Sequence, residues 1–154
     1  MKSDRRIRLL AHNVRSLWNV GSFFRTCDAF SVEKIYLTGY TGTPPRKEIT
    51  KTAIGAEDYV SWESNRDPFP FLKQMKEEGW SLVALELTPD ATSLQDFKPS
   101  SKVCLIVGHE LTGVPEEILT ICDHVVKIPM LGKKESLNVA VAAGIALYAM
   151  RSRY

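Results

Sequence analysis

The sequence IPMLGKKESLN at residues 128–138 is followed by VAVAAGIALYAM at 139–150, and the chain changes character at Ser136. The first part contains a strand end, a proline and a polar loop, whereas the second favours a helix and has no proline. We therefore expect Ser136 to be the N-cap of a C-terminal helix. No charged residue occurs in 139–150, although a surface helix ordinarily keeps a polar face. The segment is too short to cross a bilayer, which takes about 20 residues. We therefore expect protein to bury it on both sides, with a partner subunit on one of them.

The chain of 154 residues is long enough for a proper core, and we expect a single domain over 1–154. An apolar fraction of 44% with 25% charged residues argues against disorder. The net charge of +2 does not by itself indicate nucleic acid, but basic residues gather in three places. These are Lys2, Arg5, Arg6 and Arg8 at the start, then Arg46, Lys47 and Lys51, then Lys133 and Lys134. Solvated loop charges are the alternative interpretation of each cluster.

The three cysteines, Cys27, Cys104 and Cys122, have no C-x-x-C spacing and lie in apolar surroundings. They are typical of buried thiols in a reducing compartment. The histidines form no metal-binding pattern, and the basic start is not followed by the apolar segment of a secretory signal. We therefore expect a cytoplasmic protein with no metal site and no membrane association.

Apolar runs and helical spacing alternate along the chain. We predict strands at 7–11, 34–38, 59–62, 81–87, 103–107 and 125–128, and helices at 19–30, 47–54, 69–78, 115–121 and 139–150. Asn19 is the expected N-cap of the first helix. This alternation predicts an α/β fold, an open and mostly parallel sheet with helices on both faces. Ligands bind beyond the carboxyl ends of such strands, where three polar segments follow: 88–89, 108–113 and 129–136.

Common catalytic loops do not fit. No G-x-G-x-x-G or G-x-S-x-G occurs, and Cys27 has no histidine nearby in sequence. Gly108 and Gly113 have the glycine spacing of a Walker A loop, but Val114 and Pro115 replace its lysine and hydroxyl residue. What remains is a set of polar residues at loop and helix starts: Asn13, Arg15, Ser16, Asn19, Arg25, Glu110, Ser136 and Asn138. The helical neighbours of Arg25 are largely apolar, so its charged guanidinium either reaches a cleft or a partner or extends past them to the solvent as an ordinary surface arginine.

Three segments carry a resemblance to a known family. They are NVGSFFRTCDAF at 19–30, LIVGHELTGV at 105–114 and IPMLGKKESLNVAVA at 128–141. In order and spacing they resemble the three motifs of the SpoU/TrmH RNA ribose 2′-O-methyltransferases of the SPOUT superfamily. The resemblance covers essentially the whole chain. It implies a deep C-terminal trefoil knot, S-adenosylmethionine as cofactor, and a homodimer through the C-terminal helix and the helix at 19–30.

The resemblance also implies roles for particular residues. Arg25 resembles the catalytic arginine, held by Asn19, and Glu110, Ser136 and Asn138 resemble the other catalytic positions. The implied cofactor-binding residues are Thr88, Gly108, Ile128, Met130 and Leu137. An arginine is normally protonated, so Arg25 either loses a proton in the complex or orients phosphate and hydroxyl while another group accepts the proton. His109 is the competing candidate for the base.

The implied substrate is RNA, and we favour tRNA over rRNA because a small domain offers little surface to a large RNA. Arg15, Arg46, Lys47, Lys133 and Lys134, together with the basic start, are then candidates for a phosphate-binding rim. Two alternatives remain: a methyltransferase of the superfamily that acts on a base nitrogen, and a non-catalytic RNA-binding domain that keeps the knot.

Overall fold

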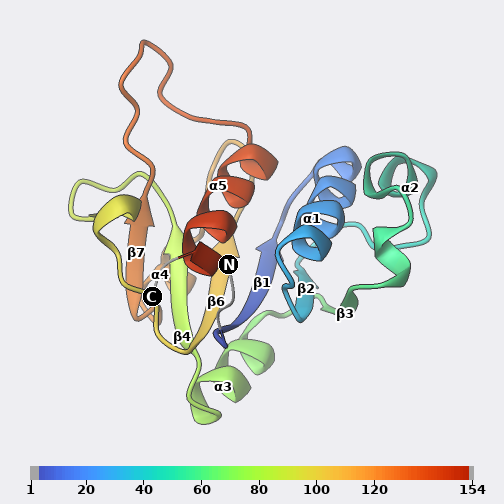
Figure 1. Ribbon diagram of the computed structural model, residues 1–154, viewed down its shortest axis with the longest axis horizontal. Helices are drawn as coiled ribbons and strands as arrows, with labels where there is room; N and C mark the ends of the chain where they lie inside the picture. The colour runs from blue at the N-terminus through green and yellow to red at the C-terminus, as the bar shows by residue number, and fades with distance from the viewer. Residues whose placement is uncertain (1–3, 153–154) are drawn as a thin grey trace.

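Residues 4–152 are described by a computed structural model, and within them seven strands form one sheet in which every neighbouring pair is parallel (Figure 1). The strand order is β3-β2-β1-β6-β4-β7-β5. The strands are β1 Arg6–His12, β2 Lys34–Thr38, β3 Ser61–Asn65, β4 Ser81–Leu85, β5 Thr92–Ser93, β6 Lys102–Val107 and β7 His124–Lys127. The predicted α/β class is confirmed.

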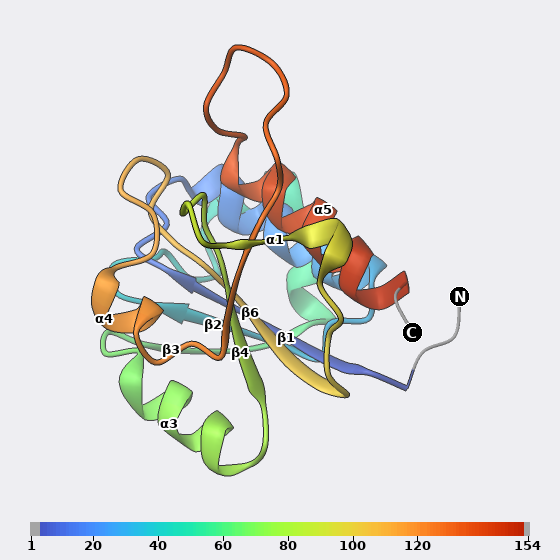
Figure 2. The ribbon, with the colours of Figure 1, turned by 90° about the vertical axis from the view of Figure 1, so that its left-hand side faces the viewer.

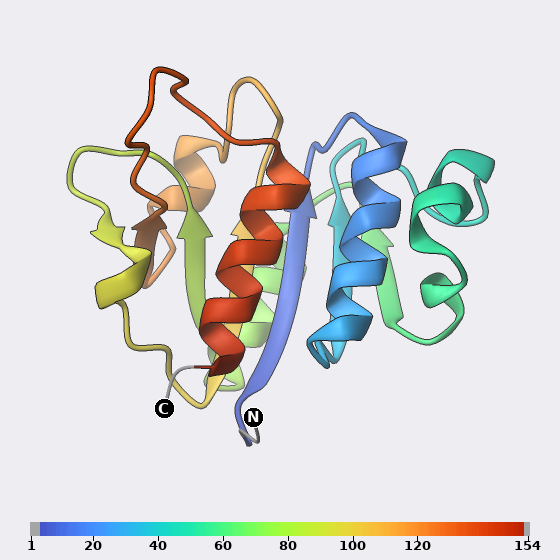
Figure 3. The ribbon, with the colours of Figure 1, turned by 45° about the horizontal axis from the view of Figure 1, so that its top comes forward.

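Helices cover both faces of the sheet, as Figures 2 and 3 show. The helices are α1 Leu17–Ala29, α2 Lys47–Ala53, α3 Phe69–Glu77, α4 Glu116–Leu119 and α5 Val139–Ser152, with single 3-10 turns η1 Ala56–Asp58 and η2 Leu94–Asp96. Successive strand residues point to opposite faces. Leu9 of β1 accordingly packs in the core that contains α1 and α5, and Leu10 in the core that contains α3 and α4.

Several predicted boundaries were wrong. Ser16, not Asn19, is the N-cap of α1, because its side chain accepts the backbone N–H of Asn19. The cap of α5 is Asn138 and not Ser136, because the Asn138 Oδ1 accepts the N–H groups of Ala140 (2.9 Å) and Val141 (3.2 Å). A side chain commonly caps the N–H two or three positions ahead, so each helix places its cap before its first turn.

The expected strand at 59–62 lies instead at Ser61–Asn65, and the expected helix at 115–121 is the single turn Glu116–Leu119. The strand β3 is an edge strand whose polar residues are mostly exposed, so no apolar alternation identifies it. The two-residue strand β5 was missed altogether because it is too short to have a period.

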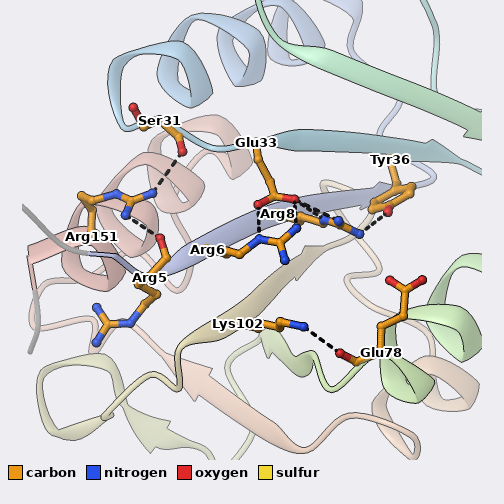
Figure 4. A network of polar contacts seen from close by, with 9 residues as sticks. All are labelled: Arg5, Arg6, Arg8, Ser31, Glu33, Tyr36, Glu78, Lys102 and Arg151. Carbon is orange, nitrogen blue, oxygen red and sulfur yellow. Dashed lines mark hydrogen bonds and ion pairs between the residues drawn. The ribbon is translucent and has the colours of Figure 1, made fainter.

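The basic residues at the start of the chain lie at the amino-end edge of the sheet, where Arg6 and Arg8 both bind Glu33 (Figure 4). Arg8 also donates to the Tyr36 hydroxyl at 2.8 Å, and its guanidinium lies 4.1 Å from the ring centre of Trp80. These arginines are therefore occupied within the fold, at the edge opposite the carboxyl ends of the strands. This position argues against a part for Arg6 and Arg8 in the predicted phosphate-binding rim; Lys2 lies outside the described residues.

Two of the cysteines are fully buried and Cys122 is partly buried, as the sequence predicted for thiols in apolar surroundings. Burial raises the pKa of the Cys122 thiol to about 12 and raises the pKa of Cys27 and Cys104 as well. Within residues 4–152, none of the helices combines the length and the apolar character needed to span a bilayer.

Candidate functional site

The carboxyl ends of three adjacent strands, β6, β4 and β7, place three segments around one pocket. The pocket has a volume of about 270 Å³. Its lining comes from the end of β4, the loop after β6, and the segment between β7 and α5: Leu85, Glu86, Leu87, Val107, Gly108, His109, Glu110, Leu111, Thr112, Gly113, Lys127, Ile128, Met130, Ser136, Leu137, Val139 and Ala142. Two of the three polar segments that the sequence placed at strand ends, 108–113 and 129–136, therefore meet at this pocket, whereas 88–89 does not line it.

Glu110 links the loop after β6 to the start of α1. Its Oε1 accepts the N–H of Arg15 at 2.9 Å, and its Oε2 accepts the N–H of Ser16 at 2.9 Å and the Asn19 amide at 3.1 Å. Burial alone would raise the pKa of Glu110, but these donors outweigh burial and the pKa is lowered. The carboxylate is thus held ionised, and its oxygens accept hydrogen bonds from residues at the start of α1. Glu110 is therefore a positioning group.

Asn19 continues this network to the third motif. The Asn138 amide donates to the Asn19 Oδ1 at 3.2 Å, so Glu110, Asn19 and Asn138 form one hydrogen-bonded chain. Asn19 is 8% exposed, and both ends of its amide are satisfied. The structure therefore brings together three candidate residues that are far apart in the sequence.

Arg25 does not join this chain. It is exposed on α1, and among the described residues no hydrogen bond or ion pair involves its side chain. Asn19 does not hold it, because the Asn19 amide is occupied by Glu110 and Asn138. Ser136 is exposed and lines the pocket.

The loop at 108–113 is closed on itself by two backbone hydrogen bonds between His109 and Gly113, of 3.2 and 2.9 Å. A Cβ on Gly108 would lie 2.4 Å from the Gly113 carbonyl oxygen. Gly113 itself has φ +73°, a conformation that favours glycine. Both glycines are thus required by the backbone of a tight loop at the pocket, which explains the Walker-like spacing without any phosphate.

His109 is a poor candidate for a base at Nδ1. That nitrogen accepts the N–H groups of Leu111 at 2.9 Å and Thr112 at 3.2 Å. Two donors directed at one nitrogen require its lone pair, so in the neutral ring the hydrogen sits on Nε2. His109 then orders the loop and presents a donor, and the sequence-based alternative loses its support.

Glu86 is a pocket residue that the sequence analysis missed. Its Oε2 accepts the N–H of Val114 at 2.8 Å, and its Oε1 accepts the N–H of Leu87 at 3.2 Å. A Cβ on Gly113 would lie 2.0 Å from this carboxylate. Glu86 therefore ties the end of β4 to the loop after β6; a carboxylate directly after an apolar strand was the signal that could have identified it.

Four of the five predicted cofactor residues, Gly108, Ile128, Met130 and Leu137, line the pocket. Thr88 does not, but its Oγ1 is buried and has no hydrogen-bond partner within residues 4–152. A buried polar atom without a partner is costly. The pocket's mixed lining of apolar side chains and polar groups, with the unsatisfied Thr88 hydroxyl one residue beyond Leu87, fits a ligand with both apolar and polar parts, as S-adenosylmethionine has.

The remaining basic candidates lie in segments that follow carboxyl ends of strands. Arg15 lines a second hollow with Ser16, His109, Glu110 and Leu111. Arg46 and Lys47 are at the start of α2, and Lys133 and Lys134 are exposed on the loop before α5, which projects from the sheet in Figure 1.

A third hollow lies where α1 and α5 pack together. It is lined by Asn19, Ser22, Thr26, Phe30, Asn138, Ala140, Val141, Gly144, Ile145 and Tyr148. Three of these apolar side chains, Val141, Ile145 and Tyr148, are 52%, 42% and 51% exposed. The chain's own residues therefore leave this side of the C-terminal helix open, and its burial by a partner subunit stays a prediction.

The model of the SpoU rRNA Methylase family matches residues 6–148. The chain belongs to this family. The resemblance predicted from the three motifs is therefore confirmed.

Individual relatives agree with this assignment. The tRNA (guanosine(18)-2′-O)-methyltransferase of Aquifex aeolicus is 34% identical over 99% of this chain and 72% of its own length. The enzyme of the same name from Thermus thermophilus is 33% identical over 96% of this chain and 75% of its own length. A solved structure, the Aquifex aeolicus TrmH/SpoU tRNA modifying enzyme, matches this chain with 33% identity and a TM-score of 0.84 over 96% of this chain and 76% of that one.

Two further solved structures are informative. An AdoMet-bound rRNA methyltransferase from Sinorhizobium meliloti has a TM-score of 0.89 and 27% identity over 95% of this chain, which spans only 56% of that protein. A structure described as giving insights into the 2-OH methylation of C/U34 on tRNA has a TM-score of 0.86 and 25% identity, and the match covers 96% of this chain and 95% of that one.

Proposed function

We propose that this protein transfers a methyl group from S-adenosylmethionine to a ribose 2′-hydroxyl of RNA, with tRNA as the substrate. The observation that carries the proposal is the chain Glu110–Asn19–Asn138, which joins all three family motifs beside the pocket. The relatives that are 33–34% identical are named tRNA 2′-O-methyltransferases, and a neighbour of almost the same extent concerns 2-OH methylation on tRNA. These names favour tRNA over rRNA.

Bound S-adenosylmethionine supplies an electrophilic methyl group on a sulfonium. Gly108, Ile128, Met130 and Leu137 would hold it in the pocket, with Glu86 fixing the loop after β6. A 2′-hydroxyl is a weak nucleophile, so the protein must orient the oxygen and allow its proton to leave. Ser136 at the pocket and Arg25 on α1 are the groups that we assign to orienting ribose and phosphate.

We further propose a homodimer through the exposed stripe of α5 and the hollow beside α1. Val141, Ile145 and Tyr148 are apolar and recur at helical spacing, which is typical of a covered face. Gly144 within the stripe adds no side chain, so a second backbone can approach closely. Because Arg25 has no partner among the described residues, we assign it to the active site of the neighbouring subunit.

A deep trefoil knot in the C-terminal part is also part of this proposal. The strand β7 lies between β4 and β5, both of which precede it in the chain, and the segment after β7 returns beside the loop of β6. This arrangement supports the proposal of a knot. The fully buried Cys27 and Cys104, both free thiols, support a reducing compartment such as the cytoplasm.

The test of catalysis uses Arg25→Ala and Arg25→Lys with radiolabelled S-adenosylmethionine and tRNA. We expect both variants to lose most methyl transfer, because a single amine does not reproduce the planar, bidentate guanidinium. Lys73→Ala, which removes one charge from α3 on the other face of the sheet, is the control. Near-normal turnover in both Arg25 variants would overturn the assigned role.

RNA affinity should also fall with ionic strength if Arg15, Arg46, Lys47, Lys133 and Lys134 contact phosphates. Removal of one such lysine should lower the slope of log affinity against log salt by about 1. An unchanged slope in the Lys133→Ala and Lys134→Ala variants would exclude these two positions.

A further inference from the structure

We infer that Trp18, backed by Lys51, forms a stacking platform for an unpaired RNA base next to the methylated nucleotide. This inference rests on the proposed function and specifies its substrate: a nucleotide in a single-stranded loop, not in a continuous duplex. It concerns residues outside the three family motifs and outside the pocket.

Trp18 is a large apolar side chain that the fold leaves exposed to solvent. It lies in the first turn of α1 and is 49% exposed, whereas Trp80 is 3% exposed. The position of its backbone is fixed, because the Trp18 carbonyl oxygen accepts a hydrogen bond from Thr52 Oγ1 of α2 at 2.8 Å. An exposed indole on an ordered backbone is a surface on which a base can stack at little cost in entropy.

Lys51 gives this surface a positive charge. Its Nζ lies 6.0 Å from the ring centre of Trp18, at the limit of a cation–π contact. Lys47 is one helical turn earlier on α2. Among residues 4–152, neither lysine is in an ion pair with a carboxylate. An aromatic face next to unneutralised lysines is complementary to a ligand that carries both a planar ring and phosphates, which favours a nucleic acid over a protein.

The platform is correctly placed for the proposed reaction. Trp18 and Arg25 are seven residues apart on α1, so they lie on one side of the helix, about 10 Å apart at 1.5 Å per residue. Neither lines the hollow between α1 and α5, which is the surface that we assign to the dimer contact. A base on Trp18 would therefore belong to a nucleotide close to the one that Arg25 contacts. Since paired bases expose no face, that nucleotide must be unpaired.

The test measures binding of two fluorescein-labelled RNAs by anisotropy: a hairpin with an unpaired loop, and a continuous duplex with the same stem. We expect Trp18→Ala to weaken binding of the hairpin about 10-fold, within the range of roughly 5- to 150-fold that stacking of one base implies. Binding of the duplex should stay unchanged, and Trp18→Phe should retain most of the affinity. Tyr59→Ala is the control. Tyr59 is 81% exposed and precedes β3, so it lies at the amino ends of the strands, whereas Trp18 lies beyond the carboxyl end of β1.

A second readout observes the indole directly. In a protein with Trp62→Phe and Trp80→Phe, Trp18 is the one remaining tryptophan, and hairpin RNA should quench its fluorescence more than duplex RNA does. Equal hairpin affinity in wild type and Trp18→Ala would overturn the inference. An equal loss of affinity for hairpin and duplex would also overturn it. So would an indole that is shielded from acrylamide in the free protein, together with a dimer that dissociates in Trp18→Ala, because these two results would assign Trp18 to a protein contact. Methyl transfer by the wild type tests the proposed function separately: turnover with no effect of Trp18 refutes only the platform.

Discussion

Replacement of Asn138 separates two tasks that this side chain performs. Its Oδ1 caps α5 through Ala140 and Val141, and its amide donates to the Asn19 Oδ1. Loss of an N-cap costs about 1 kcal/mol, and loss of a hydrogen bond to a nearly buried acceptor costs about 1 kcal/mol more. We therefore expect Asn138→Ala to lower the free energy of unfolding by about 2 kcal/mol, which corresponds to a decrease in Tm of roughly 4–8 °C in a domain of this size.

Asn138→Ser is the informative comparison. A serine hydroxyl can cap the helix but does not reach Asn19 with an amide, so about half of the lost stability should return while methyl transfer remains impaired. The measurement is urea unfolding followed by circular dichroism, at one protein concentration because a dimer makes stability concentration-dependent. Two results would refute the reasoning: Asn138→Ala within about 0.3 kcal/mol of wild type, or a serine variant no more stable than the alanine variant.

Three further predictions use the same structure. Hydrogen-bond donors lower the pKa of Glu110 in the folded protein, so its contribution to stability should be present above its unfolded pKa of about 4.3 and be lost as pH falls through the lower folded pKa. Glu110→Gln should remove this part of the acid dependence of stability. A pH profile identical to that of wild type would contradict this. Gly113→Ala should weaken cofactor binding, measured by calorimetry, more than Gly55→Ala does, since both glycines have positive φ but only Gly113 abuts Glu86; equal cofactor affinities of the two variants would exclude a role for that contact. Ile145→Glu should give monomers in sedimentation, whereas the exposed Ile54→Glu should not; a persistent dimer would place the interface elsewhere.

The sheet could be predicted because its central strands are continuous apolar runs. The strands β1 and β6 are buried on both faces, and such runs are recognised without any periodicity. The edge strand β3 and the short β5 gave no such signal, since their pairing depends on neighbours distant in the sequence. The cap of α1 was placed too late, at Asn19 in place of Ser16, and that of α5 too early, at Ser136 in place of Asn138. Several polar residues near each helix start are suitable caps, and only the structure shows which one accepts the N–H groups.

The sequence predicted which residues form the candidate site better than it predicted the hydrogen bonds between them. The motifs identified Glu110, Asn19 and Asn138, but the hydrogen bonds between them required the fold. The family resemblance implied that Asn19 holds Arg25, whereas in the structure the Asn19 amide bonds to Glu110 and Asn138 from two distant segments. Glu86 could have been noticed as a carboxylate directly after an apolar strand, but its bond to the Val114 backbone required the fold.

The central claim is methyl transfer to a ribose oxygen of RNA. The most direct measurement incubates the protein with methyl-labelled S-adenosylmethionine and total RNA from cells that lack it, then digests the RNA and locates the label. We predict label in tRNA, on a nucleotide whose 2′-O-methyl group makes the following phosphodiester bond resistant to alkali. Label on a base nitrogen, or no transfer to any RNA by a protein that binds the cofactor, would contradict the account.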